Sequence, residues 1–166
     1  MGMDGQYVRV TPAELSRAIE DPDWAMDLVE GIQDTEEETE PPPTKARYLT
    51  THKAWQSIAF LLDRAGFPVD IVNGEQPFAD DVDWGYGPPR YLTAEQVQSA
   101  AQALAATTFD QLTDGVSRAD LATAQVYPQI WDEVDSLDWI RGCYEPLAQF
   151  FTTAARHDNG MLIWLS

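Results

Sequence analysis

The sequence has little cysteine, little histidine and no long hydrophobic run. Cys143 is the only cysteine, which excludes a disulfide within the chain and fits the reducing cytoplasm, where we expect the protein to act. His52 and His157 are the only imidazoles, so no zinc cluster has ligands at the required spacing. We therefore expect no metal centre and no cofactor.

Membrane and secretion signals are also absent from the sequence. No stretch approaches eighteen consecutive apolar residues, and the opening MGMDGQYVRV has neither the basic nor the apolar region of a signal peptide. No nucleophile elbow, dinucleotide fingerprint or phosphate-binding loop occurs either. The sequence thus contains no recognisable catalytic constellation, which argues against an enzyme, and it predicts no membrane partner.

Positive charge is scarce. Ten Lys and Arg residues face 28 Asp and Glu residues, for a formal net charge of −18. Such a charge repels phosphate backbones, so it argues against nucleic acid as a partner and favours a basic protein. Solubility is the simpler explanation of the same charge.

The chain does contain the material of one globular domain, which we place at residues 1–166. Its 166 residues are 44% apolar and include six Trp, six Tyr and six Phe, enough for a core rich in aromatic side chains. YVRV and RYL each read as a short strand that leads into a helix. The helices begin at Thr11 and Thr93, where Glu14 and Gln96 complete capping boxes.

Residues 33–46, QDTEEETEPPPTKA, offer almost nothing to bury. Adjacent like charges and three prolines oppose both helix and strand, so we expect a mobile acidic and proline-rich loop at about 33–46. About 32 residues before it are too few for a core of their own, so the loop lies within one domain. A functional role in attracting a basic partner is the alternative to a solvated loop.

Further elements follow from periodicity. Residues 53–65 predict a helix that ends at Gly66, FPVDIVNG predicts a short strand, and residues 136–156 predict a long helix that Pro146 kinks or divides. The terminal MLIWLS predicts a buried strand beside YVRV. The fold class is therefore α+β: a predominantly helical single domain with a small sheet that includes the N-terminal and C-terminal strands.

WGYGPPRY, residues 84–91, is the most unusual stretch of the chain. Its glycines and prolines indicate an ordered irregular loop, and Arg90 is its only cation. One interpretation is structural, with Arg90 tying the loop to a carboxylate or to carbonyls at a helix end. The other is a pocket in which Arg90 meets an anionic group between Trp84, Tyr86 and Trp131. A loose divalent-cation site from Glu75, Asp80, Asp81 and Asp83 competes with a simple turn of solvated carboxylates.

Two function classes remain open. The first is a noncatalytic interaction protein that binds or neutralises a basic partner. The second is a binding protein or enzyme for a small anionic ligand, built on the loop at residues 75–91. The candidate ligand-binding residues are Glu75, Trp84, Tyr86, Arg90, Tyr91, Tyr127, Trp131 and Asp132.

Several strings in a fixed order resemble the YfbM-like family, a bacterial domain of unknown function. They are GMDGQYVRVTPAEL, KAWQSIAFLL, the loop NGEQPF to GYGPPRYLT, VYPQIWD and GMLIWLS. The resemblance runs from end to end and implies an α+β cytoplasmic domain without an established activity. The chain departs from it in the acidic and proline-rich insertion at residues 34–43, and in Gln56 and Ala59, where members often carry a histidine.

Overall fold

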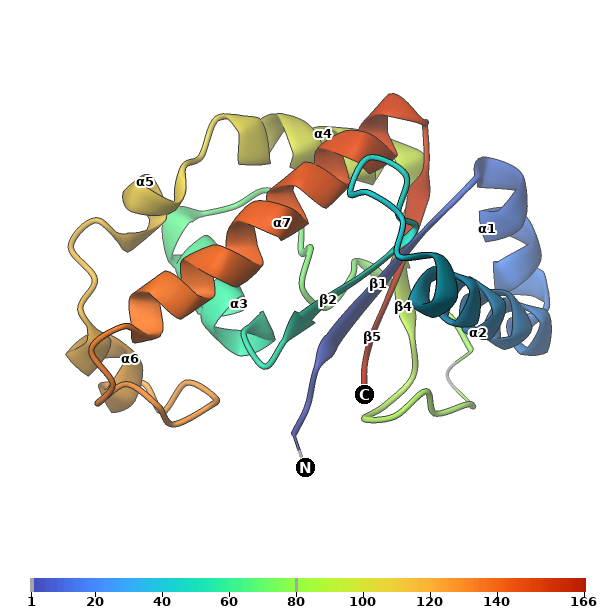
Figure 1. Ribbon diagram of the computed structural model, residues 1–166. Helices are drawn as coiled ribbons and strands as arrows, with labels where there is room; N and C mark the ends of the chain where they lie inside the picture. Colours follow the sequence, from blue (N-terminus) through green and yellow to red (C-terminus); the bar gives the residue numbers. More distant parts are fainter. Residues whose placement is uncertain (1, 80) are drawn as a thin grey trace.

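A five-stranded antiparallel sheet runs through the centre of the protein, with helices on both faces (Figure 1). The computed structural model describes residues 2–79 and 81–166. Within these residues the strand order is β2-β1-β5-β4-β3. The strands are β1 (Gly5–Val10), β2 (Tyr48–His52), β3 (Gln76–Pro77), β4 (Arg90–Leu92) and β5 (Gly160–Leu165).

The two faces of the sheet carry separate cores. Val8 and Leu162 pack with the helices on one face, and Tyr7 and Ile163 pack with those on the other, as the alternation of strand side chains requires. Helices α1 (Pro12–Glu20) and α2 (Pro22–Thr39) cover the first face. The second face is covered by α3 (Trp55–Ala65), α4 (Ala94–Ala105), α5 (Phe109–Thr113), α6 (Arg118–Thr123) and α7 (Ser136–Arg156).

The C-terminal strand lies at the middle of the sheet, which confirms the expected fold class. β5 pairs with β1 through Tyr7↔Ile163 and Val8↔Leu162, and its other edge pairs with β4.

Both predicted capping boxes are confirmed. The Thr11 hydroxyl accepts the Glu14 amide N–H at 3.1 Å, and the Thr93 hydroxyl accepts the Gln96 amide N–H at 3.2 Å.

The predicted loop at about 33–46 is wrong over its first half, because α2 continues to Thr39. Glutamate is a good helix former, so the acidic run carries the helix forward despite its like charges. The Glu36 carboxylate also accepts the amide N–H groups of Arg47 at 2.7 Å and Tyr48 at 3.2 Å, which ties the last turns of α2 to β2. The helix ends at Glu40, in the left-handed region at φ 45°, directly before the three prolines.

Two other expectations are corrected. FPVDIVNG forms turns instead of a strand, because the Asp70 carboxylate accepts the amide N–H groups of Val72 and Asn73 and competes with sheet pairing. Pro146 does not divide the last helix, since α7 is continuous from Ser136 to Arg156. Pro146 is exposed, whereas Tyr144 before it and Leu147 after it are buried. The buried face of α7 therefore continues past the proline.

No helix among the described residues combines the length and the apolar character that a membrane span needs.

Candidate functional site

A groove follows one side of α2 and consists of two hollows. The first, of about 650 Å³, lies at the C-terminal end of the helix, and the second, of about 380 Å³, lies beside its middle. Gln33 lines both hollows, so they meet at this residue, and together we call them the α2 groove. The first is lined by Gln33, Asp34, Glu36, Glu37, Glu40, Pro41, Ala46 and Tyr48. The second is lined by Met26, Val29, Glu30, Gln33, Asp83, Trp84, Trp164 and Ser166.

A row of hydrogen-bonded polar side chains on the sheet links the two hollows. The Tyr48 hydroxyl donates to Gln6 Oε1, and Gln6 Nε2 donates to Ser166 Oγ at 2.9 Å. Burial raises the pKa of the Tyr48 hydroxyl, and the negative charge of Asp4 adds to the rise. The hydroxyl therefore stays protonated and holds its bond to Gln6, which keeps this row ordered.

One end of the groove is aromatic. The rings of Trp84 and Trp164 meet edge to face with centroids 5.3 Å apart, and each residue is 7% exposed. The exposed carboxylates of Glu30 and Asp83 line the same hollow. The Asp83 carboxylate is held in place because it accepts the Gly85 amide N–H at 2.7 Å. Indole rings beside carboxylates make a setting that attracts cationic side chains.

The other end of the groove concentrates negative charge. Asp34, Glu37 and Glu40 are exposed there, and none of them belongs to either of the two ion pairs found within residues 2–79 and 81–166. The last turn of α2 contains no basic residue. Because the C-terminal end of a helix is itself negative, the helix dipole adds to the field of these carboxylates.

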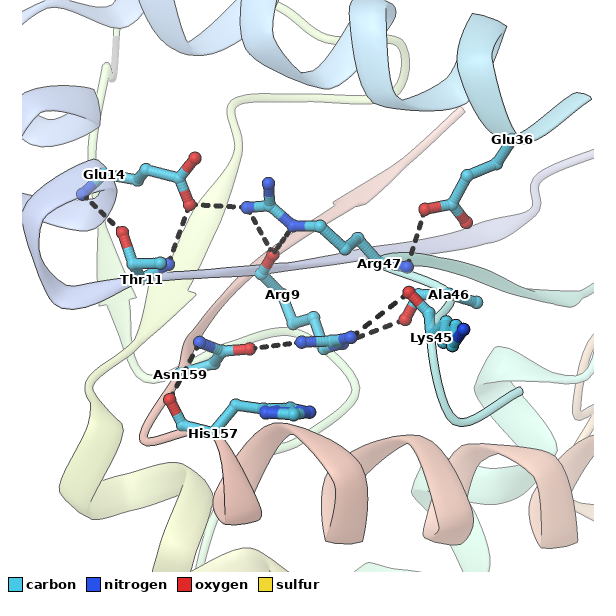
Figure 2. Close-up of polar contacts among 9 residues, drawn as sticks. All are labelled: Arg9, Thr11, Glu14, Glu36, Lys45, Ala46, Arg47, His157 and Asn159. Carbon is cyan, nitrogen blue, oxygen red and sulfur yellow. Dashed lines mark hydrogen bonds and ion pairs between the residues drawn. The ribbon is translucent and has the colours of Figure 1, made fainter. Parts of the chain in front are cut away.

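Next to the groove lies an arginine clamp, which we define as Arg9, Arg47, Asn159, Glu14 and Glu36 (Figure 2). Glu36 belongs to both, because it also lines the first hollow of the groove. Arg9 is 7% exposed and donates to Asn159 Oδ1 at 2.7 Å, and it also donates to the carbonyls of Lys45 and Ala46.

Arg47 forms an ion pair with Glu14 and donates to the Arg9 carbonyl. The clamp thus fixes the segment that leads from α2 into β2, and with it one wall of the α2 groove.

Two pKa shifts reflect this internal pairing. Burial lowers the pKa of the Arg9 guanidinium, and the positive charge of Arg47 lowers it further. For Glu14, burial acts to raise the pKa, but hydrogen bonds from the Thr11 backbone and from Arg47 outweigh it and lower the pKa below the ordinary value. The charges of the clamp are therefore committed to one another and to the backbone.

The cation of the predicted loop also has a structural role. Arg90 Nε donates to the Gly74 carbonyl at 2.9 Å, and its terminal nitrogen donates to the Glu75 carbonyl at 3.0 Å. Arg118 likewise donates to the carbonyls of Trp131 and Asp132. The carbonyls that Arg90 meets belong to a turn, whereas the structural interpretation named a carboxylate or a helix end.

The structure separates the candidate residues into two groups on opposite faces of the sheet. Trp84 lies in the α2 groove, Tyr91 packs against Phe78 beside it, and Tyr86 is 52% exposed. Glu75 lies instead with the core of the other face, where it lines a hollow with Leu62 and Ile71 and accepts the Asp70 amide N–H.

The second group surrounds the turn before α7. Trp131 is buried in the core of the other face and donates to the Val126 carbonyl, and the Tyr127 hydroxyl accepts the Met3 amide N–H. Asp132 is exposed on the same turn. Trp84, Tyr86 and Trp131 therefore do not enclose a common pocket. For the divalent-cation alternative, Asp80 lies outside the described residues, and no cluster of three or more metal-ligating side chains occurs among those described.

Sequence reasoning missed most of the α2 groove. Met26, Glu30, Gln33, Glu37 and Glu40 recur three or four positions apart, the spacing of one helix face. That signal is present in the sequence, but it is visible only when the acidic run is read as helix.

Comparisons with known proteins identify a family without an assigned activity. Residues 1–164 match the family model described as Domain of unknown function (DUF1877). The fold is similar to the crystal structure of YfbM from Escherichia coli, a protein of unknown function, with a TM-score of 0.66 and 19% sequence identity. That match covers 98% of this chain and 99% of the other. The search of curated proteins finds no match.

Proposed function

Since this chain belongs to the DUF1877 family of domains of unknown function, we propose its function from the site itself: it is a noncatalytic domain that binds a basic segment of a partner protein in the α2 groove. One observation carries the proposal. Carboxylates that have no cationic partner among residues 2–79 and 81–166 line a single groove together with two tryptophan rings, on a chain of net charge −18.

The acidic end of the groove supplies the attraction. Asp34, Glu37 and Glu40 stand at the negative end of α2, where each adds unfavourable energy to the isolated helix. A lysine or arginine of a partner relieves that repulsion on binding. The field also speeds the encounter with a basic partner, an effect that weakens as salt is added.

The aromatic end supplies selectivity for one inserted side chain. A guanidinium or ammonium group in the second hollow meets the rings of Trp84 and Trp164 together with the carboxylates of Glu30 and Asp83. Such a cation is attracted by both the ring quadrupoles and the negative charges. An anionic or purely apolar side chain gains nothing comparable there.

The length of the groove suits a short extended peptide. Between Met26 and Glu40 the helix axis rises about 21 Å. An extended chain covers that distance with about six residues. We further propose the cytoplasm as the compartment of this interaction, because the chain has a single, half-buried cysteine and no means of forming an internal disulfide.

Titration with a fluorescently labelled hexalysine peptide tests the proposal. The groove variant carries Asp34→Asn, Glu37→Gln and Glu40→Gln together, which removes three charges from exposed side chains. We expect saturable binding to the unmodified protein, a change in tryptophan fluorescence, and an affinity about tenfold lower in the variant.

A matched control separates a site from bulk charge. The control variant removes the same number of exposed carboxylates from the turn before α7, by Asp132→Asn, Glu133→Gln and Asp135→Asn. We expect it to retain most of the affinity. Equal losses in the two variants, or the absence of binding at low salt, would contradict a specific groove.

A further inference from the structure

The outer edge of β2 lies next to the α2 groove, and at Thr50 it is open to pairing. β2 is an edge strand among the described residues, and the Tyr48 amide N–H points away from β1, where it donates to Glu36. Strand geometry repeats every two residues, so the amide and carbonyl of Thr50 also point outward. An edge with outward N–H and C=O groups is a template for another strand.

A third hollow, of about 350 Å³, follows this edge. It is lined by Tyr48, Leu49, Thr50, His52, Gly142, Cys143 and Pro146. Tyr48 also lines the acidic hollow of the α2 groove, so the groove reaches the edge of the sheet at this residue.

The α7 side of the third hollow leaves room for a backbone. Gly142 has no side chain, and a Cβ placed there would meet nothing within 4 Å. Pro146 has no amide N–H, so the Gly142 carbonyl lacks its usual partner one turn along the helix. Cys143 is half-buried, and burial raises the pKa of its thiol, which stays neutral. This side of the hollow is therefore small and uncharged.

We infer that the basic segment held in the α2 groove continues past Tyr48 and adds as a strand to the outer edge of β2. This inference rests on the proposed function and extends it by naming the class of partner. The added strand lies between the acidic C-terminal end of α2 on one face and Cys143 and Pro146 on the other. Because strand side chains alternate between faces, the recognised sequence alternates basic and small apolar residues.

Two labelled peptides distinguish the inference from the proposed function. One is hexalysine, which needs only the groove, and the other is hexalysine followed by Val-Lys-Val-Lys. We expect the longer peptide to bind about tenfold more tightly, and we expect it alone to slow hydrogen exchange at the Thr50 amide.

The first variant pair acts on the edge of β2. Thr50→Pro removes the outward amide N–H, a change that edge strands tolerate, whereas Thr50→Val keeps it. Both substitutions remove the Thr50 hydroxyl, which bonds to the Gly5 carbonyl and the His52 amide, so the loss of these bonds is common to the two variants. We expect the gain from the longer peptide to vanish in Thr50→Pro and to persist in Thr50→Val.

A second pair keeps the test decisive if the proline variant does not fold. Gly142→Leu fills the open space on α7, and Gly31→Leu adds the same side chain to an open position on α2. We expect the gain to be lost only in Gly142→Leu. Equal affinity for the two peptides, with unchanged exchange at Thr50, would overturn strand addition while hexalysine binding still supported the groove. Failure of both peptides to bind would overturn the proposed function as well.

Discussion

Two charged regions meet at Glu36 near the C-terminal end of α2, the arginine clamp and the α2 groove. In the clamp, Arg47 is paired with Glu14, and both oxygens of the Glu36 carboxylate accept amide N–H groups. In the groove, Glu37 lies one position further along the same helix and is exposed, outside both ion pairs of the described chain. Of two adjacent glutamates that line the first hollow, one thus has its carboxylate bound to backbone amides and the other has an exposed carboxylate.

The difference separates charges that stabilise the fold from charges that our proposal assigns to the recognition of a basic segment. Charges that are paired inside the fold hold β1, β2 and the segment before β2 in a fixed geometry. Negative charges left unpaired at a helix C-terminus lower the stability of the fold, and binding of an external cation would offset that loss. Substitutions in the clamp should therefore change stability, and substitutions of the exposed groove carboxylates should change binding.

The largest effect is expected from Arg9→Ala. It leaves the buried Asn159 Oδ1 and the partly buried carbonyls of Lys45 and Ala46 without their donor, so the free energy of unfolding should fall by about 3 kcal/mol. Urea denaturation measures this loss. Lys45→Ala is the control, because the Lys45 side chain is exposed and its carbonyl remains. Equal stability of the two variants would show that the clamp contributes little.

A smaller loss is expected from Arg90→Ala, in β4. Two carbonyls, those of Gly74 and Glu75, lose their donors, for a cost of about 2 kcal/mol. Arg90→Lys should recover only part of it, because an ammonium cannot reproduce a two-pronged contact.

Thermal melting of both Arg90 variants, with the exposed Arg156→Ala as control, measures the difference. Unchanged melting in Arg90→Ala would assign Arg90 to ligand binding instead of the fold.

Local signals explain the parts of the fold that the sequence predicted. A capping box involves only residues three positions apart, so the helix starts at Thr11 and Thr93 could be predicted from the sequence. The terminal strand could be predicted because the five consecutive apolar residues at 161–165 offer burial without helical spacing. The family resemblance is confirmed by the match over residues 1–164.

Distant contacts explain what could not be predicted. The helical structure of the acidic run is supported by hydrogen bonds that Glu36 accepts from the amide N–H groups of Arg47 and Tyr48, more than ten residues away. The aromatic end of the groove depends on Trp84 meeting Trp164, which the order of the sheet brings together. No local pattern encodes either contact, so the sequence drew attention to Trp84 without indicating its partner.

Substitutions of the adjacent Glu36 and Glu37 compare the two regions directly, with smaller expected changes in the free energy of unfolding. Glu36→Gln replaces a carboxylate oxygen that accepts an amide N–H by an NH₂ group, so stability should fall by about 1 kcal/mol. Glu37→Gln removes a negative charge from the C-terminal end of α2, and stability should stay level or rise by about 0.5 kcal/mol. Chemical denaturation at low salt measures both. Changes of the same sign would refute the division between clamp and groove.

The smallest effect concerns pH and Glu14. Its pKa is lowered in the folded protein, so the carboxylate contributes stability that is fully present above its unfolded pKa of about 4.3 and is lost as pH falls through the folded pKa.

Glu14→Gln keeps a side chain suited to the capping box but removes the charge that pairs with Arg47. The variant should be less stable than the unmodified protein near pH 6, by less than about 1 kcal/mol because the pair is partly exposed. The difference should shrink as the pH approaches 3, because the unmodified protein then loses the same charge. Urea denaturation at each pH measures the gap, and Glu37→Gln serves as the reference without a clamp contact. A gap for Glu14→Gln that stayed constant down to pH 3 would mean that its ion pair with Arg47 adds nothing to the clamp.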